Sequence, residues 1–183
     1  MKYGQWHDIE VEDDVTTYVE YENGATGVFV TTTGDVHGTN RFEIQMDKAK
    51  IVVTYGGIEL KEFSVSEPEW TATCKEGFAC MPATDIQVET DGKNEQHNGV
   101  INAWGGAILR GEPMIADGRE GINGLMLSNA MHLSAFLGKE VTLPIDEDLF
   151  KEELMKRVAT SRHKAAPAQP AEVVDLSSTY GGK

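Results

Sequence analysis

The 183-residue chain carries 30 acidic and 16 basic side chains, a net charge of −14, and 40% hydrophobic residues. The acidic excess excludes a nucleic-acid phosphate backbone or an anionic membrane surface as the natural partner, because both require clustered Lys and Arg. The hydrophobic content is that of a globular protein and allows one domain with a core of its own.

The N-terminal sequence MKYGQWHDIEVEDD lacks the apolar stretch of a signal peptide. No apolar run approaches the roughly 20 residues needed to cross a bilayer. A cytoplasmic location is therefore expected. The two cysteines, Cys74 and Cys80, are expected to be reduced thiols, with a local disulfide as the alternative.

The first half of the chain is predicted to form β-strands. Segments 15–21 and 25–33 are rich in β-branched and aromatic residues, and Glu22-Asn23-Gly24 between them has the sequence of a tight hairpin turn. Further strand-like segments cover residues 40–46, 51–54, 58–63 and 85–90. We expect five or six antiparallel strands in one meandering sheet, interrupted by an excursion over 64–83 for which no conformation is predicted.

The pattern changes to a helical period after Gly92. A first helix carries Val100, Ile101, Trp104 and Ile108 on one face and ends at Gly111-Glu112-Pro113. A second and stronger helix is expected to follow Asp117 and Glu120, which form a D-x-x-E capping pattern.

The last part of the chain is predicted to be a strand, a helix and a tail. The second helix ends at Gly138, a short strand covers 141–143, and Asp146 caps the last helix. From Lys164 the composition cannot bury enough apolar surface to order the chain. The expected division is therefore a domain at 1–163 and a disordered tail at 164–183.

Strands grouped first and helices grouped later indicate an α+β fold. The expected architecture is an open-faced, mainly antiparallel β-sheet with helices packed on one face. The other face carries alternate side chains of the same strands, and an apolar face of five strands exceeds what monomers leave exposed. Self-association through the open sheet face, as a dimer or a larger oligomer, is expected.

Several catalytic and nucleotide-binding motifs are missing from the sequence. No strand leads into a G-x-G-x-x-G turn, and Gly118, Gly121 and Gly124 are spaced by three inside a predicted helix. No phosphate-binding P-loop, H-E-x-x-H helix or G-x-S-x-G elbow is present. We therefore expect no Rossmann domain, no cofactor and no resident metal in this chain.

Four residues are candidates for contact with a substrate, each with a structural alternative. His37 lies in a glycine-bounded segment that is otherwise a plain turn. Arg41 can bind a hydroxyl or a carboxylate, or pair with the neighbours of Glu43 across the sheet. His97 can donate a hydrogen bond to a polyol with Asn98 beside it, or Asn98 can cap the first helix and leave the imidazole exposed.

No histidine has a partner identifiable from the sequence, so no acid–base pair and no catalytic residue are assigned. His7 precedes an acidic run that is typical of a solvated edge. A metal-dependent hydrolase would require this run to converge with His37 or His97. Whether the chain is an enzyme is left open.

Three long segments resemble the C-terminal half of the glucose–fructose oxidoreductase/inositol dehydrogenase/MocA family. The segments are WHDIEVEDDVTTYVEYENGATGVF, GTNRFEIQMDKAKIVV and the stretch from His97 to Phe150. The similarity runs from about Trp6 to about Arg162. Met46-Asp47-Lys48-Ala49-Lys50 departs from the family pattern, which usually has glycines around this turn, and suggests a slightly altered hairpin.

The resemblance implies a division of labour within a two-domain enzyme. In this family an N-terminal dinucleotide-binding domain holds NAD or NADP and supplies the catalytic residues, while the C-terminal domain covers the substrate and forms the dimer interface. The similarity begins after the family's catalytic histidine. It therefore implies a substrate-binding and oligomerisation domain of a sugar or polyol dehydrogenase, inactive alone, with His37, Arg41, His97 and Asn98 as substrate contacts. A stand-alone interaction module that pairs through its sheet face is the alternative.

Overall fold

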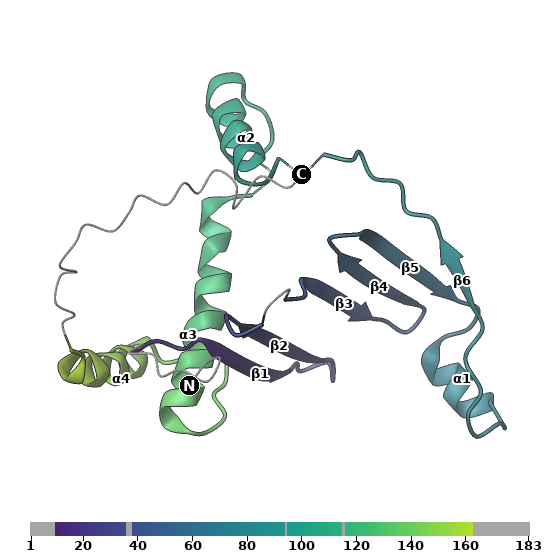
Figure 1. Cartoon of the computed structure of the whole chain (residues 1–183), viewed down its shortest axis with the longest axis horizontal. Helices are drawn as coiled ribbons and strands as arrows, with labels where there is room; N and C mark the ends of the chain where they lie inside the picture. Colours follow the sequence, from purple (N-terminus) through teal and green to yellow (C-terminus); the bar gives the residue numbers. More distant parts are fainter. Residues whose placement is uncertain (1–9, 36–37, 94, 115, 163–183) are drawn as a thin grey trace. The chain divides into compact units, whose positions relative to one another are not determined.

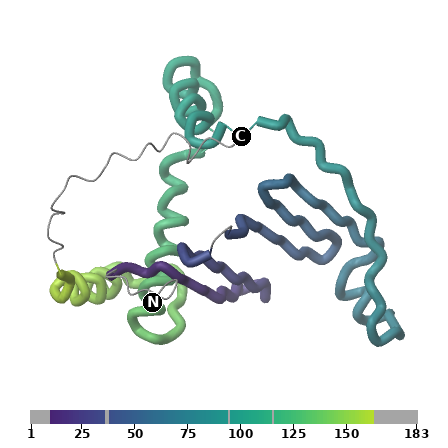
Figure 2. The backbone as a smooth tube through the Cα atoms, in the orientation of Figure 1, coloured from purple at the N-terminus to yellow at the C-terminus, as the bar shows by residue number. Residues whose placement is uncertain are grey.

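The computed structural model describes residues 10–35, 38–93, 95–114 and 116–162. Strands come first and the long helices follow, as Figures 1 and 2 show, so the α+β class and the open antiparallel sheets are confirmed. The chain divides into two compact units. Unit 1 is Glu12–Gly118, and unit 2 combines residues 10–11 with 119–162.

The first two strands form a hairpin. β1 (Asp14–Glu20) and β2 (Thr26–Thr32) pair antiparallel in an unbroken register from Asp14 opposite Thr32 to Glu20 opposite Thr26. The turn is closed by hydrogen bonds from the Tyr21 N–H to the Ala25 carbonyl and from the Gly24 N–H to the Tyr21 carbonyl, each 2.9 Å. Gly24 has a φ of 84°, so the Asn-Gly turn predicted from the sequence is confirmed.

The other four strands form a second sheet in the order β3-β4-β5-β6. They are β3 (Arg41–Gln45), β4 (Ala49–Thr54), β5 (Gly57–Phe63) and β6 (Ala83–Ile86), all antiparallel. The Met46 N–H donates to the Ala49 carbonyl at 2.8 Å, so the turn without family glycines still closes a hairpin.

The prediction of one meandering sheet is wrong, because β2 and β3 belong to different sheets. Short turns connect β1 to β2, β3 to β4 and β4 to β5, and each of these pairs is antiparallel. Residues 33–40 separate β2 from β3. A connection of that length does not enforce pairing, whereas a tight turn does.

The excursion between β5 and β6 contains a short helix, α1 (Glu67–Thr73). The Ser66 side chain accepts a hydrogen bond from the Glu69 N–H, and Pro68 stands in the first turn. The ends of the excursion are held together by a hydrogen bond of 3.2 Å from the Ser64 N–H to the Pro82 carbonyl. Cys74 and Cys80, after α1, are free thiols.

Helix α2 (Gln96–Arg110) ends at Gly111, which has a φ of 69° and donates its N–H to the Ala107 carbonyl. The predicted glycine exit is thus confirmed. The alternative role of Asn98 as helix cap is wrong. The helix already begins at Gln96, and the Asn98 N–H donates to the Glu95 carbonyl at 3.0 Å, which places Asn98 inside the first turn.

Unit 2 has its core between α3 (Gly121–Leu137) and α4 (Glu147–Thr160). Three residues are buried, and partly buried apolar side chains pack against them; the set is Ala130, Leu133, Ile145, Met126, Leu137, Val141, Leu149 and Phe150. The Arg157 guanidinium lies 3.6 Å above the centre of the Phe136 ring, which also stacks with Phe150.

One sequence prediction is confirmed in unit 2 and one is wrong. Asp146 caps α4 by accepting the Leu149 N–H at 3.0 Å, as expected. A 3₁₀ turn (Gly118–Glu120) runs directly into α3, and Glu120 makes no side-chain capping bond there. Residues 141–143 form no strand, since Val141 packs on the helical core instead.

None of the helices in the described ranges is long and apolar enough to cross a membrane. The predicted domain boundary at residue 163 and the tail at 164–183 lie outside the described residues and stay predictions. The packing of helices on one sheet face likewise stays a prediction.

Replacing Gly24 by Ala is expected to destabilise the protein by about 1 kcal/mol, because an L-residue at this positive φ is strained. Urea denaturation followed by circular dichroism measures the change. Gly77→Ala is the matched control, since Gly77 has no positive φ and an added Cβ would meet no atom within 4 Å. Equal losses in both variants would contradict the turn assignment.

Candidate functional site

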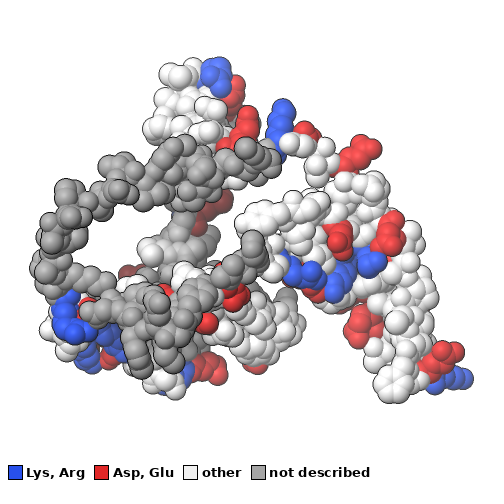
Figure 3. All heavy atoms as spheres, viewed as in Figure 1, with Lys and Arg blue, Asp and Glu red and all other residues white. Residues whose placement is uncertain are grey.

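One face of the four-stranded sheet carries alternating charges that pair with one another. Glu43 accepts hydrogen bonds from Arg41 on its own strand and binds Lys50 on β4, where the Lys50 Nζ lies 2.5 Å from the Glu43 Oε1. Lys61 on β5 pairs with Asp85 on β6. Figure 3 shows positive and negative side chains interleaved over this sheet.

The ion pairs change the ionisation of the carboxylate at their centre. Hydrogen bonds from Lys50 first, and then from Arg41, hold the pKa of Glu43 below its ordinary value. Val52, directly opposite Glu43 and Glu59 in the strand register, is only 6% exposed. The long charged side chains around it therefore cover an apolar residue while their charges stay in water.

Arg41 lies on the charged face, where its partner is on its own strand and not across the sheet. Its guanidinium is bound to Glu43 itself, and Lys50 shares the same carboxylate. Beside it, the Asn40 amide donates to the Tyr55 hydroxyl at 3.3 Å, which joins the start of β3 to the β4–β5 turn. Arg41, Asn40 and Tyr55 thus form a polar group at one end of the sheet.

The opposite face of the same sheet is mainly apolar. Residues directly opposite each other in the strand register share a face, and the large apolar residues here are Phe42, Ile44, Ile51, Val53, Ile58, Leu60 and Ile86. Glu62 and Thr84 lie at one end of the same face. Phe42 is 62% exposed, Ile58 39% and Ile44 37%, and the other four are half-buried. We call these seven residues the apolar sheet face.

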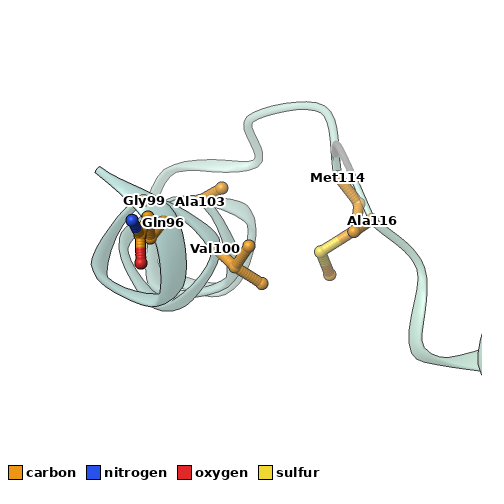
Figure 4. Close-up of a pocket in the computed structure, with 6 residues that line it drawn as sticks. All are labelled: Gln96, Gly99, Val100, Ala103, Met114 and Ala116. Carbon is orange, nitrogen blue, oxygen red and sulfur yellow. The ribbon is translucent and has the colours of Figure 1, made fainter. Parts of the chain in front are cut away.

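His97 and Asn98 lie on the first turn of α2, and both are exposed. Gln96, which precedes them, has a φ of 46°, and it lines a shallow pocket of about 190 Å³. Figure 4 shows Val100 on the helix and Met114 on the returning chain facing each other across this pocket. Its lining is otherwise made of small residues, Gly99, Ala103 and Ala116.

The four predicted contact residues are distributed over separate elements. His97 and Asn98 share a helical turn, Arg41 lies on β3 within the ion pairs, and His37 lies outside the described residues. Their role as substrate contacts stays a prediction. No group of three or more His, Cys, Asp or Glu side chains suited to a metal ion occurs in the ranges that the structure describes.

The glycines of residues 118–124 do not fit a dinucleotide. A pyrophosphate site requires a strand that ends in a glycine turn at a helix N-terminus. Here Gly118 lies in the 3₁₀ turn, Gly121 and Gly124 lie in α3, and residues 111–117 before them contain no strand in their described part.

Comparison with known families agrees with the fold. Residues 1–143 match the family described as "Oxidoreductase family, C-terminal alpha/beta domain". The chain belongs to the C-terminal domain of the Gfo/Idh/MocA oxidoreductase family. Among curated proteins none matches the chain. The resemblance inferred from the sequence segments is therefore confirmed for the greater part of the chain.

The sequence predicted an apolar sheet face, and the strand register identifies its members. A hydrogen bond at the polar end of the sheet was not predicted. The Asn40–Tyr55 hydrogen bond spans 15 residues and had no local signal.

Replacing Glu43 by Gln is expected to lower stability at neutral pH, because Lys50 and Arg41 lose their shared carboxylate. A carboxyl with a lowered pKa stabilises the fold above its ordinary pKa and stops doing so as the pH falls through the lowered value. The difference from the wild type should therefore shrink below about pH 4. Urea unfolding at pH 7 and at acid pH measures it.

Glu89→Gln is the control, because Glu89 is exposed and forms no ion pair within the described part of the chain. A Glu43→Gln deficit that is the same at both pH values would show that the charge of Glu43 is not what stabilises the sheet.

Proposed function

We propose that this chain is the substrate-binding and oligomerisation domain of an NAD(P)-dependent sugar or polyol oxidoreductase of the cytoplasm. The observation that carries the proposal is the family match over residues 1–143, together with a sheet that is mainly apolar on one side. The chain is proposed to be inactive alone, with NAD or NADP held by a nucleotide-binding half.

The apolar sheet face supports self-association. Fully burying a Phe or Ile side chain stabilises by about 1.5–3 kcal/mol, and seven such residues stand together on this face. Face-to-face contact with a second copy would cover Phe42, Ile44 and Ile58, which are the most exposed of the set. The opposite face has its charges paired internally, so it can remain in water.

The polar groups at Arg41 and at the start of α2 are the proposed substrate contacts. Hydroxyl groups of a sugar are bound by side chains that donate and accept hydrogen bonds, such as guanidinium, imidazole and amide groups. Arg41, His97 and Asn98 supply these three chemistries on exposed positions. His37 completes the proposed set.

A second candidate function is a stand-alone interaction module that pairs through the apolar sheet face, with itself or with a full-length relative. The specific observation in its favour is that this face needs neither a substrate nor a cofactor in order to be buried. Binding of a sugar distinguishes the two functions, because only the first requires it.

Replacing Phe42 by Asp is expected to convert an oligomer into a monomer, because a carboxylate would be buried without a partner in the interface. Sedimentation velocity at tens of micromolar measures the change. Phe78→Asp is the matched control, since Phe78 is fully exposed in the loop after α1, away from the apolar sheet face. A wild-type protein that is strictly monomeric would overturn the proposed self-association.

Titration with NAD, NADH, NADP and NADPH in a calorimeter is expected to give no binding in the micromolar range. Titration with myo-inositol and glucose is expected to shift the amide resonances of Arg41, His97 and Asn98. The Arg41→Gln variant should weaken this response if its guanidinium contacts the hydroxyls. Micromolar binding of a nicotinamide cofactor would refute the proposal. Amide resonances that do not shift with either sugar, in a protein that forms oligomers, would favour the interaction module.

A further inference from the structure

Two cysteines lie on either side of a turn in the loop between α1 and β6. Cys74 directly follows α1 as its C-cap, and Cys80 lies six positions further along the chain. Residues 77–78 form a turn midway between them, which directs the chain back on itself. Six extended residues span about 20 Å, whereas a disulfide requires Cα atoms about 4.4–6.8 Å apart. The turn thus removes the main obstacle to a bond between these two residues.

The side chain of Cys74 is directed to this turn. Its Sγ donates a weak hydrogen bond to the Glu76 carbonyl at 3.6 Å, so the sulfur lies against the residue that precedes the turn. Cys74 is half-buried and Cys80 is exposed, and both are free thiols. A thiol reacts with a dissolved disulfide only where the solute reaches its sulfur. Neither thiol is buried, so both meet this requirement.

The base of the loop is already closed. Phe63 at the end of β5 lies opposite Ala83 at the start of β6, and the Ser64 N–H donates to the Pro82 carbonyl at 3.2 Å. A bond between the two cysteines would therefore close a smaller ring inside a loop whose two ends are fixed. Oxidation is expected to leave the pairing of β5 with β6 intact, because the new bond lies outside both strands.

We propose that Cys74 and Cys80 are a redox modification site, at which a low-molecular-weight disulfide such as oxidised glutathione converts the two thiols into a bond across the turn. The thiolate of Cys80, the more exposed residue, attacks one glutathione sulfur and displaces a first reduced glutathione. The Cys74 thiolate then attacks the Cys80 sulfur of this mixed disulfide and displaces the second. Two electrons and two protons pass from the protein to glutathione, and one S–S bond is exchanged for another.

The turn that carries Phe78 is what this reaction changes. Phe78 is fully exposed at the turn, between the two cysteines. Closing the ring of residues 74–80 restricts the backbone dihedral angles available to the turn, and so holds Phe78 in fewer conformations. Excess reduced glutathione reverses the reaction, as is usual for thiol pairs of the cytosol. The site is independent of the proposed substrate contacts and of self-association.

Oxidation of the full chain tests the site directly. After incubation with oxidised glutathione and blocking of the remaining thiols with iodoacetamide, the intact mass should show a loss of two hydrogens and no glutathione adduct. Peptide mapping should place the bond between Cys74 and Cys80. In Cys74→Ser the adduct on Cys80 should persist at least roughly tenfold longer than in the wild type, because no neighbouring thiol displaces it. Wild-type adducts that persist as long as those of Cys74→Ser, or bonds formed only between two chains, would overturn the proposal.

Chymotrypsin measures the effect on the turn, with the fragments counted after reduction of the digest. Cleavage after Phe78 should be roughly three- to tenfold slower in the oxidised protein, because a protease requires its substrate to open locally, and should recover after dithiothreitol. Tyr55 is the control site in the same molecule, since it is exposed in the turn between β4 and β5, which contains neither cysteine. Its cleavage rate should not change. Equal rates at Phe78 in both forms would overturn the proposed restraint of the turn.

Discussion

The alternation of side chains along β3, β4 and β5 is the constraint on which this domain depends. Successive residues point to opposite faces of a sheet, and the antiparallel register places the apolar residues of neighbouring strands opposite one another. The result is a sheet with Phe42 and Ile51 on one side and Glu43 and Lys50 on the other. Charges on the second side satisfy one another, so only the apolar side requires a partner.

This asymmetry fits the role of a domain that contributes surface to an oxidoreductase. The glycines at 118–124 lie in a 3₁₀ turn and α3, where no phosphate turn forms. The polar groups that remain exposed, at Arg41 and at His97, are suited to hydrogen bonds with hydroxyls. Their placement on a strand and on a helix terminus gives each a fixed backbone.

Local sequence signals predicted most of the elements, and the failures occurred where partners are distant. The Asn-Gly turn, the glycine exit of α2 and the Asp146 cap depend on a few adjacent residues, and all three formed. Helix α1 carried the same kind of signal in Ser66 and Pro68, which the irregular composition around them obscured. The expected strand at 141–143 failed because the α3–α4 core offered Val141 an apolar environment without a neighbouring strand.

The sequence by itself determined the α+β class, the family, the order of the strands and helices and most of their ends, because these depend on periodicity and on residues close in the chain. Only the tertiary structure decided that the strands form two sheets, that Asn40 binds Tyr55, and that Glu10 binds the end of α4. Each of these depends on which distant residues meet. Pairing across long connections is set by the balance of burial, hydrogen bonding and chain entropy over the whole fold, and no local pattern encodes it.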